Sequence, residues 1–237
     1  MEFAAAALLL AAVPEATTAC IDANGAAILR GSIAKPGFKR GFTVVAWNAG
    51  DLASPQAGRV MRSLVRAGAN AVTLVPVWYQ GHGIGAGLDP EPSGGTAALA
   101  EVANAARAAT ALGLHVTIKP HLDARDGVWR GDFEPGGPEG GPAARRAWLE
   151  SYRARLLRLV EVAEAARAGS LVLGTELQRI STDSGLEPQW RALIAEVRGR
   201  FSGRLTYAGN WGRQDGEYRR SPFGTPWTAW GSMRTSR

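Results

Sequence analysis

The sequence has only one cysteine, three histidines and three lysines among its 237 residues. The single cysteine, Cys20, excludes a disulfide-stapled scaffold and a cysteine-based zinc cluster. Three histidines, at His82, His115 and His121, are too few for a histidine-rich metal site. The longest apolar run, Phe3–Val13, has 11 residues, which is too short to span a bilayer as a helix.

The positive charge of the chain is almost all arginine and is not gathered in one place. The 27 basic and 21 acidic residues give a net charge of +6, and all but three of the basic residues are arginine. A surface that binds nucleic acid concentrates such charge in one run or on one face, whereas these arginines lie mostly near Glu or Asp. We therefore expect no nucleic-acid partner. Hydrophobic residues make up 46% of the chain, which is enough for a full core and excludes wholesale disorder.

The N-terminal apolar run predicts export. Phe3–Val13 has the length of the apolar region of a signal peptide, and small residues follow it before Cys20. No basic residue precedes the run and Glu2 is acidic, so a buried helix or a wrongly assigned start codon is the alternative. We expect residues 1–20 to be a signal peptide of a secreted or periplasmic protein, which would be cytoplasmic if the run is not a signal. A lipoprotein anchor on Cys20 is less favoured, because Thr-Thr-Ala before it lacks the usual larger aliphatic residue.

From Arg40 onward, short apolar runs alternate with segments of helical spacing. The apolar runs predict five strands, at Phe42–Trp47, Ala71–Val77, His115–Pro120, Ser170–Gly174 and Leu205–Ala208. The segments between them predict four helices, at Pro55–Ala67, Thr96–Leu112, Pro142–Ala168 and Pro188–Phe201. Strands that are apolar on both faces and alternate with helices indicate a parallel sheet covered by helices.

A doubly wound fold and a (β/α)8 TIM barrel both satisfy this α/β pattern. No Gly-rich phosphate-binding loop follows any strand, which argues against a nucleotide-binding doubly wound fold. Each of the five strands instead delivers polar or aromatic residues to its carboxyl end, where the active sites of barrels lie. A complete barrel needs roughly 250 residues. We therefore predict an incomplete (β/α)8 barrel over residues 40–212, with about five βα units present and strands six to eight missing.

The residues at these strand ends combine amides and carboxylates with aromatic rings. Sugar hydroxyls pair with amides and carboxylates, and the flat C–H faces of sugars stack on indole rings, so the combination predicts a carbohydrate site. Each residue alone also has a structural explanation, because rim aromatics pack in cores and a polar residue often holds a loop. The candidates are Trp47, Asn48, Trp78, Tyr79, Gln80, His121, Asp123, Trp129, Glu176, Asn210 and Trp211.

Glu176 is the strongest catalytic candidate, because it ends an apolar strand in the segment VLGTEL. Its carboxyl group would rise from the floor of the barrel as the general acid of glycoside hydrolysis, which needs two carboxylates. The alternative is a strand-end salt bridge with an arginine such as Arg179. A metal pair at His121 and Asp123 would need further histidines, and His115 lies at the opposite end of its strand. We therefore expect no metal or organic cofactor.

Several segments resemble glycoside hydrolase family 113. They are WNAGD, GANAVTLVPVWYQ, GLHVTIKPHLDARDGVWRGDF, SYRARLLRLVEVAEAARAGSLVLGTEL and WRALIAEVRGRFSGRLTYAGNW. The resemblance covers roughly residues 40–211 and implies a β-mannanase-like barrel enzyme, monomeric when intact, that hydrolyses β-linked glycans with retention. It implies that Glu176 is the acid/base and that the sugar subsites are lined by Trp78, Tyr79, His121, Asp123, Trp129, Asn210 and Trp211. The nucleophile of that family is a second Glu at the end of a seventh strand, after the point where this sequence stops.

The last segment, Glu217–Arg237, shows neither a strand nor a helical period and contains four arginines. One permissible choice of codons, read two bases later, encodes VPSVPFWDALDRVGIDAYFP, which resembles the family at this point. We therefore expect residues 213–237 to be an out-of-frame or disordered tail, with the frame lost between about Trp211 and Glu217. Such a chain would lack the nucleophile and be inactive. The alternatives to an enzyme are a non-catalytic glycan-binding protein and a pseudogene product.

Overall fold

A computed structural model describes residues 38–80, 88, 95–210 and 216–223, and assigns two short strands at 20–21 and 27–28. The expected signal peptide lies outside the described residues, except for Cys20 in the first short strand, so export stays a prediction. Trp211 and residues 224–237 lie outside them as well. No helix in the described ranges is both long enough and apolar enough to cross a membrane.

The main body alternates strands and helices along the chain. A separate antiparallel pair precedes it, formed by β1 (Cys20–Ile21) and β2 (Ala27–Ile28). The strands of the main sheet are β3 (Gly41–Ala46), β4 (Ala71–Gln80), β5 (His115–Ile118), β6 (His121–Ala124), β7 (Ser170–Thr175) and β8 (Arg204–Ala208). The helices are α1 (Pro55–Arg66), α2 (Leu99–Ala111), α3 (Gly141–Ala165), α4 (Gln178–Ser181), α5 (Glu187–Arg200) and α6 (Glu217–Arg220), with 3-10 turns η2 (Gly137–Glu139) and η3 (Ser184–Leu186).

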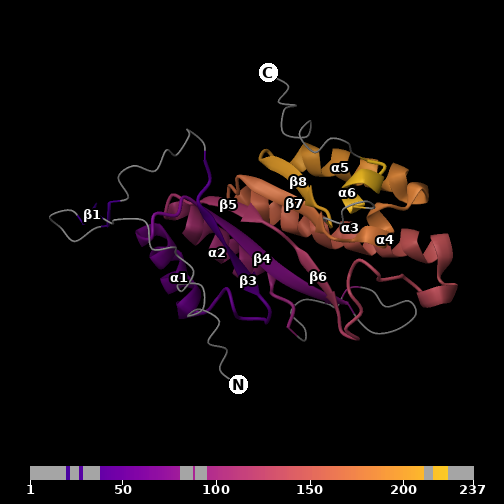
Figure 1. Cartoon of the computed structure of the whole chain (residues 1–237), viewed down its shortest axis with the longest axis horizontal. Helices are drawn as coiled ribbons and strands as arrows, with labels where there is room; N and C mark the ends of the chain where they lie inside the picture. The colour runs from indigo at the N-terminus through magenta and orange to yellow at the C-terminus, as the bar shows by residue number, and fades with distance from the viewer. Residues whose placement is uncertain are drawn as a thin grey trace, which may run out of the picture.

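The strands of the main sheet are parallel and follow one another in chain order. The sheet order is β3-β4-β5-β7-β8, so the strands keep their chain order along this path, and β6 pairs with β4 off the path (Figure 1). A barrel wall has such an order, whereas a doubly wound sheet reverses direction at a switch point. The predicted barrel class, with about five βα units, is therefore confirmed. Among the described strands, β3 and β8 form the two edges of the sheet.

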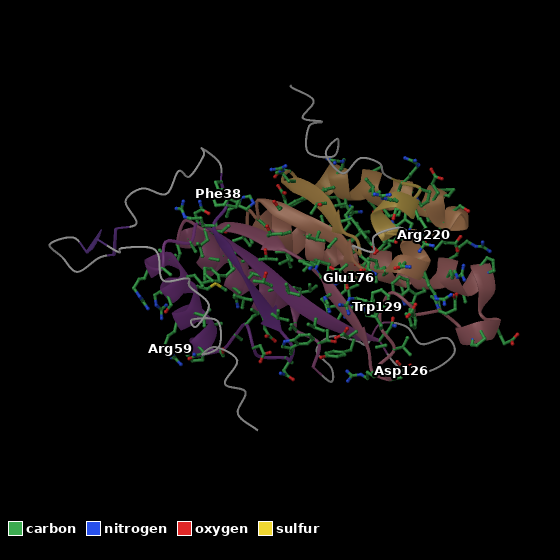
Figure 2. The ribbon with its side chains drawn as sticks, in the orientation of Figure 1. Phe38, Arg59, Asp126, Trp129, Glu176 and Arg220 are labelled. Atoms are coloured by element: carbon green, nitrogen blue, oxygen red, sulfur yellow. The ribbon has the colours of Figure 1, made fainter. Side chains whose placement is uncertain are left out.

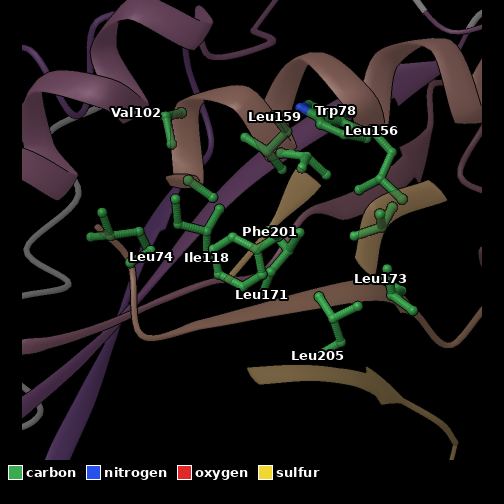
Figure 3. Close-up of a cluster of buried hydrophobic side chains, with 14 of the residues drawn as sticks. Leu74, Trp78, Val102, Ile118, Leu156, Leu159, Leu171, Leu173, Phe201 and Leu205 are labelled. Carbon is green, nitrogen blue, oxygen red and sulfur yellow. The ribbon is translucent and has the colours of Figure 1, made fainter. Parts of the chain in front are cut away.

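The apolar core lies between the sheet and one layer of helices, in which α1, α2, α3 and α5 each contact the next. Ile118 and Leu171 from the strands meet Val102 of α2 and Leu156 and Leu159 of α3, and all five side chains are fully buried (Figure 3). Burying each of these leucines stabilises the fold by roughly 2 kcal/mol. This packing fixes the strands, and therefore also fixes their carboxyl ends.

Two strands differ from their predicted boundaries, and both differences affect the site. β4 continues three residues past Val77, to Gln80. The strand predicted at His115–Pro120 ends at Ile118 and resumes as β6, which pairs with the carboxyl half of β4. Proline has no N–H for a strand ladder, so Pro120 interrupts the strand. His121 and Asp123 therefore lie within a strand and not after one.

The short helix α6 falls in the segment that we expected to be out of frame or disordered. Glu217 is fully buried there, and the ring of Phe223 packs on Trp190 and Tyr207 with centroid distances of 4.9 and 5.9 Å. For residues 216–223 the structure therefore differs from the expected disordered tail. Four helical residues are too few to show a period, so no sequence pattern predicted this helix. The reading-frame hypothesis stays a prediction, which the nucleotide sequence of the gene tests.

Candidate active site

Side-chain alternation along β4 decides which of its residues face the site. Trp78 pairs with Leu122 across β4 and β6, and Tyr79 pairs with Asp123. Successive strand residues point to opposite faces of a sheet, so Tyr79 shares a face with His121 and Asp123. Trp78 points the other way, toward the helices. It is fully buried and meets the ring of Tyr152 in α3 edge-on at 5.9 Å.

Gln80 lies on the same helix side as Trp78. It is fully buried, and its Oε1 accepts a hydrogen bond of 3.1 Å from Nε1 of Trp148 in α3. The expectation that Trp78 and Gln80 line a sugar subsite is therefore wrong, because the helix layer covers both side chains. Alternation leaves only Tyr79 of the WYQ segment on the face of the site.

An aromatic rim forms where β3 and β4 end. Trp47 is 48% exposed and meets the ring of His121 edge-on, with a centroid distance of 6.1 Å. The hydroxyl of Tyr79 donates a hydrogen bond of 3.2 Å to the carbonyl of Trp47, and the guanidinium of Arg125 lies 4.8 Å from the centre of the Tyr79 ring. The backbone of Trp47 is thus tied to Tyr79, while about half of the Trp47 side chain stays exposed.

The two predicted asparagines lie in loops at the same end of the sheet. Asn48 is exposed, and its backbone N–H donates to the carboxylate of Asp51 at 2.8 Å, which closes the turn after β3. The Nδ2 of Asn210 donates to Oε1 of Gln178 at 3.3 Å, which ties the loop after β8 to α4. Trp129, in the loop after β6, is 37% exposed.

Glu176 follows the last residue of β7 in a backbone conformation that is uncommon for a residue with a side chain. Its φ is +52°, in the left-handed region, where a non-glycine residue costs about 1 kcal/mol. Its N–H donates to the carbonyl of Ala208 in β8 at 2.8 Å. This conformation carries the side chain of Glu176 to the site, close to the loop of Trp129 (Figure 2).

Arg130 links the two carboxylates of the site, and the sequence interpretation missed it. Its Nη1 lies 3.1 Å from Oδ1 of Asp123, and its Nη2 lies 3.1 Å from Oε2 of Glu176. Glu176 therefore does form an ion pair, as in the alternative interpretation of this residue, but with Arg130 and not with Arg179, which pairs with Glu134 at 3.7 Å. Arg130 lies in a loop, where no periodicity predicts which way a side chain points. Only its position between Trp129 and Gly131 could have drawn attention to it as a site residue.

Burial and the positive charge of Arg130 set the protonation of the histidine in the site. Burial first, and then the positive charges of Arg130 and Lys119, together lower the pKa of His121 to about 4. His121 is therefore neutral at neutral pH, and the 3.6 Å between its Nε2 and Asp123 is not an ion pair. Burial raises the pKa of Asp123, against the effect of Arg130. A neutral imidazole beside a carboxylate suits hydrogen bonding to hydroxyl groups.

The described part of the chain contains no group of three or more His, Cys, Asp or Glu side chains placed to hold a metal ion. A polar pocket of about 470 Å³ adjoins the site through α4. It is lined by Asp132, Arg145, Gln178, Arg179, Thr182, Asp183, Ser184 and Arg220. The arrangement as a whole offers an open aromatic rim, a neutral histidine and two carboxylates joined by one guanidinium.

Known proteins resemble this chain over most of its length. The sequence profile of Glycoside Hydrolase Family 113 matches residues 41–219. The chain is similar to the solved GH113 β-mannanase AaManA from Alicyclobacillus acidocaldarius, in complex with ManMIm, with 30% identity and a TM-score of 0.63 over 72% of this chain and 54% of that one. It is also similar to a GH113 β-1,4-mannanase, with 26% identity and a TM-score of 0.60 over 72% and 55% of the two chains. The chain thus spans about half the length of these relatives. No curated protein sequence matches it.

Proposed function

This chain belongs to glycoside hydrolase family 113, and on that premise we propose that it carries the acid/base half of a retaining site for β-linked, mannan-like glycans. The observation that supports the proposal is the position of Glu176. It ends β7 at the carboxyl face of a barrel-type sheet, next to Arg130 and the aromatic rim. The solved relatives are β-mannanases, which supports a β-mannan-like substrate.

In the proposed reaction, the Glu176 carboxyl group donates its proton to the glycosidic oxygen as the bond to the anomeric carbon breaks. The same carboxylate then removes a proton from the water that releases the sugar. Retention needs a nucleophilic carboxylate about 5 Å away, and the resemblance places it on a seventh strand. The described sheet holds five consecutive βα units and no seventh strand. The tests below therefore measure glycan binding, and cleavage with a nucleophile supplied from solution.

The first test measures binding of a linear β-1,4-manno-oligosaccharide by calorimetry. We expect Trp47→Ala and Trp129→Ala each to weaken binding about tenfold, because each removes an exposed ring on which a sugar can stack. The matched control is Phe42→Ala, which removes an aromatic ring of 42% exposure from the opposite end of β3. Equal losses in all three variants would refute the placement of the glycan on this rim.

The second test measures turnover of β-1,4-mannan with azide as the external nucleophile. We expect glycosyl azide from the unaltered chain and at least a hundredfold less from Glu176→Gln. Glu161→Gln removes a carboxylate that is 68% exposed on α3 and is the control that should keep full turnover. Turnover that is unchanged in Glu176→Gln would remove the acid/base assignment.

A non-catalytic glycan-binding protein is the second candidate. The open Trp47 rim and the Arg130 bridge between Asp123 and Glu176 support it, because neither requires a chemical step. Binding at the rim without any azide-dependent turnover would favour this candidate over the enzyme.

A further inference from the structure

A buried carboxylate behind Glu176 has no part in the proposed chemistry. Glu217 of α6 is fully buried, and its described hydrogen-bond partners are two hydroxyls and a backbone N–H. Its Oε1 accepts hydrogen bonds from the hydroxyls of Ser181 and Tyr207, and its Oε2 accepts one of 2.7 Å from the backbone N–H of Asn210. Three donors therefore converge on one carboxylate, which keeps the buried charge satisfied.

Tyr207 connects this carboxylate to the backbone that follows Glu176. Its hydroxyl accepts a hydrogen bond of 2.9 Å from the N–H of Leu177. A tyrosine hydroxyl has a single proton, so donating that proton to Glu217 turns a lone pair toward Leu177. Burial and the Glu217 carboxylate raise the pKa of Tyr207, so the hydroxyl keeps the proton that it donates.

The ring of Tyr207 cannot easily move away from this position. Trp190 and Phe223 pack edge-on against it at 6.1 and 5.9 Å. On its other side, a Cβ added at Gly174 in β7 would come within 2.8 Å of the ring. Tyr207 is thus held between α5, the residues after α6 and the end of β7, with its hydroxyl aimed at Leu177.

Glu176 needs such support because its φ is positive. Strained backbone persists only where neighbouring contacts hold it. The hydrogen bonds on either side of the Glu176 Cα do this: Glu176 N–H to Ala208, and Leu177 N–H to Tyr207. We propose that Glu217 is a positioning residue for Glu176, acting through the Tyr207 hydroxyl and the Leu177 N–H. This proposal rests on the proposed function in one respect, namely that Glu176 is the acid/base.

The isosteric variant Glu217→Gln tests the arrangement. An amide has one acceptor oxygen, so it cannot accept from both hydroxyls and from Asn210 N–H as the carboxylate does. We expect the Leu177 amide to exchange with solvent about tenfold faster in Glu217→Gln, measured by NMR on the full ¹⁵N-labelled chain. Tyr207→Phe should give the same acceleration, and it is the second variant if Glu217→Gln does not fold.

The matched control is Tyr152→Phe. The Tyr152 hydroxyl donates to the carbonyl of Leu173 at 2.9 Å, so this variant also removes one buried hydrogen bond to β7 but leaves Leu177 alone. Its Tm should fall less than that of Tyr207→Phe, which loses the hydrogen bonds to both Glu217 and Leu177, and exchange at Leu177 should not become faster. If Leu177 exchanges equally fast in Tyr152→Phe and Glu217→Gln, the role of Glu217 is merely structural and the proposal fails.

Turnover provides the second readout. With azide and mannan, Glu217→Gln should lower kcat about tenfold with KM unchanged, because the glycan rim is intact while the acid is misplaced. Tyr152→Phe should keep kcat. A fall in kcat that is equal in both variants would overturn the proposal. If the unaltered chain shows no turnover, the proposed function fails, and exchange at Leu177 still decides the role of Glu217.

Discussion

Acidification should destabilise the fold through one histidine of the site. The imidazole of His121 is 14% exposed, and its pKa is lowered from 6.5 to about 4 by burial first, and then by Arg130 and Lys119. Between these two pKa values the unfolded chain binds a proton at this position and the folded chain does not. The free energy of unfolding therefore falls as the pH drops through this window. From pH 7.5 to pH 5 the loss from His121 is about 2 kcal/mol.

The assay compares urea unfolding of the unaltered chain and of His121→Gln at several pH values. The difference in unfolding free energy between the two proteins should change by about 2 kcal/mol between pH 7.5 and pH 5. The other titrating groups are common to both proteins, so their contributions largely cancel in the difference between the two unfolding free energies. Asp123 is one of these groups. Because its pKa is raised in the folded chain, the folded chain takes up this proton more readily, and acidification stabilises the fold at Asp123 whereas it destabilises the fold at His121. A difference that stays flat across this range would refute the neutral, buried state of His121.

Three further predictions concern Arg130, Gly174 and Arg167. Arg130→Met should lower the free energy of unfolding by about 2 kcal/mol, because it leaves two carboxylates without their partner. In an NMR titration it should also move the pKa of His121 up from about 4 toward 6.5, and an unmoved pKa would contradict the charge effect. Gly174→Ala should cost about 2 kcal/mol in urea unfolding, since the new methyl group meets the Tyr207 ring, and no loss would show that the ring is free to shift. Arg167→Gly should raise the midpoint of thermal unfolding, with a gain of about 1 kcal/mol, because Arg167 is exposed at φ +54° just after α3; a lower midpoint would contradict this.

Periodicity predicted most of the fold. The strands starting at Ala71 and Ser170 begin at the predicted residue, and α1 begins at the predicted Pro55. These elements carry strong local signals, because their apolar spacing matches one structural period and a proline or glycine marks an end. The chain order of the strands in the sheet followed from the alternation of strands and helices.

The candidate site was predicted less completely, and strand alternation explains the errors. The segment Trp78-Tyr79-Gln80 looked like three site residues while β4 was expected to end at Val77. Because the strand continues to Gln80, its side chains alternate, and only Tyr79 faces the site. Trp78 and Gln80 instead complete the core beside Tyr152 and Trp148.

Two side chains of the site and its surroundings, Arg130 and Glu217, were missed because only the tertiary fold places them. Arg130 reaches Glu176 from a loop, 46 residues earlier in the sequence. Glu217 lies in a segment that looked random, and its three hydrogen bonds come from Ser181 in α4 and from Tyr207 and Asn210 at the end of β8 and just after it. No local pattern encodes such contacts, so sequence periodicity could not reveal them.

The most direct test of the central claim, that Glu176 is the general acid, is the dependence of azide-supported turnover on the leaving group. The substrates are aryl β-manno-oligosides with a dinitrophenyl or an unsubstituted phenyl leaving group. A dinitrophenolate leaves without protonation, whereas a phenolate needs the proton of Glu176. We predict that Glu176→Gln slows the phenyl substrate at least a hundredfold and the dinitrophenyl substrate by no more than a few-fold. Equal slowing of both substrates, or no turnover of either by the unaltered chain, would contradict the account.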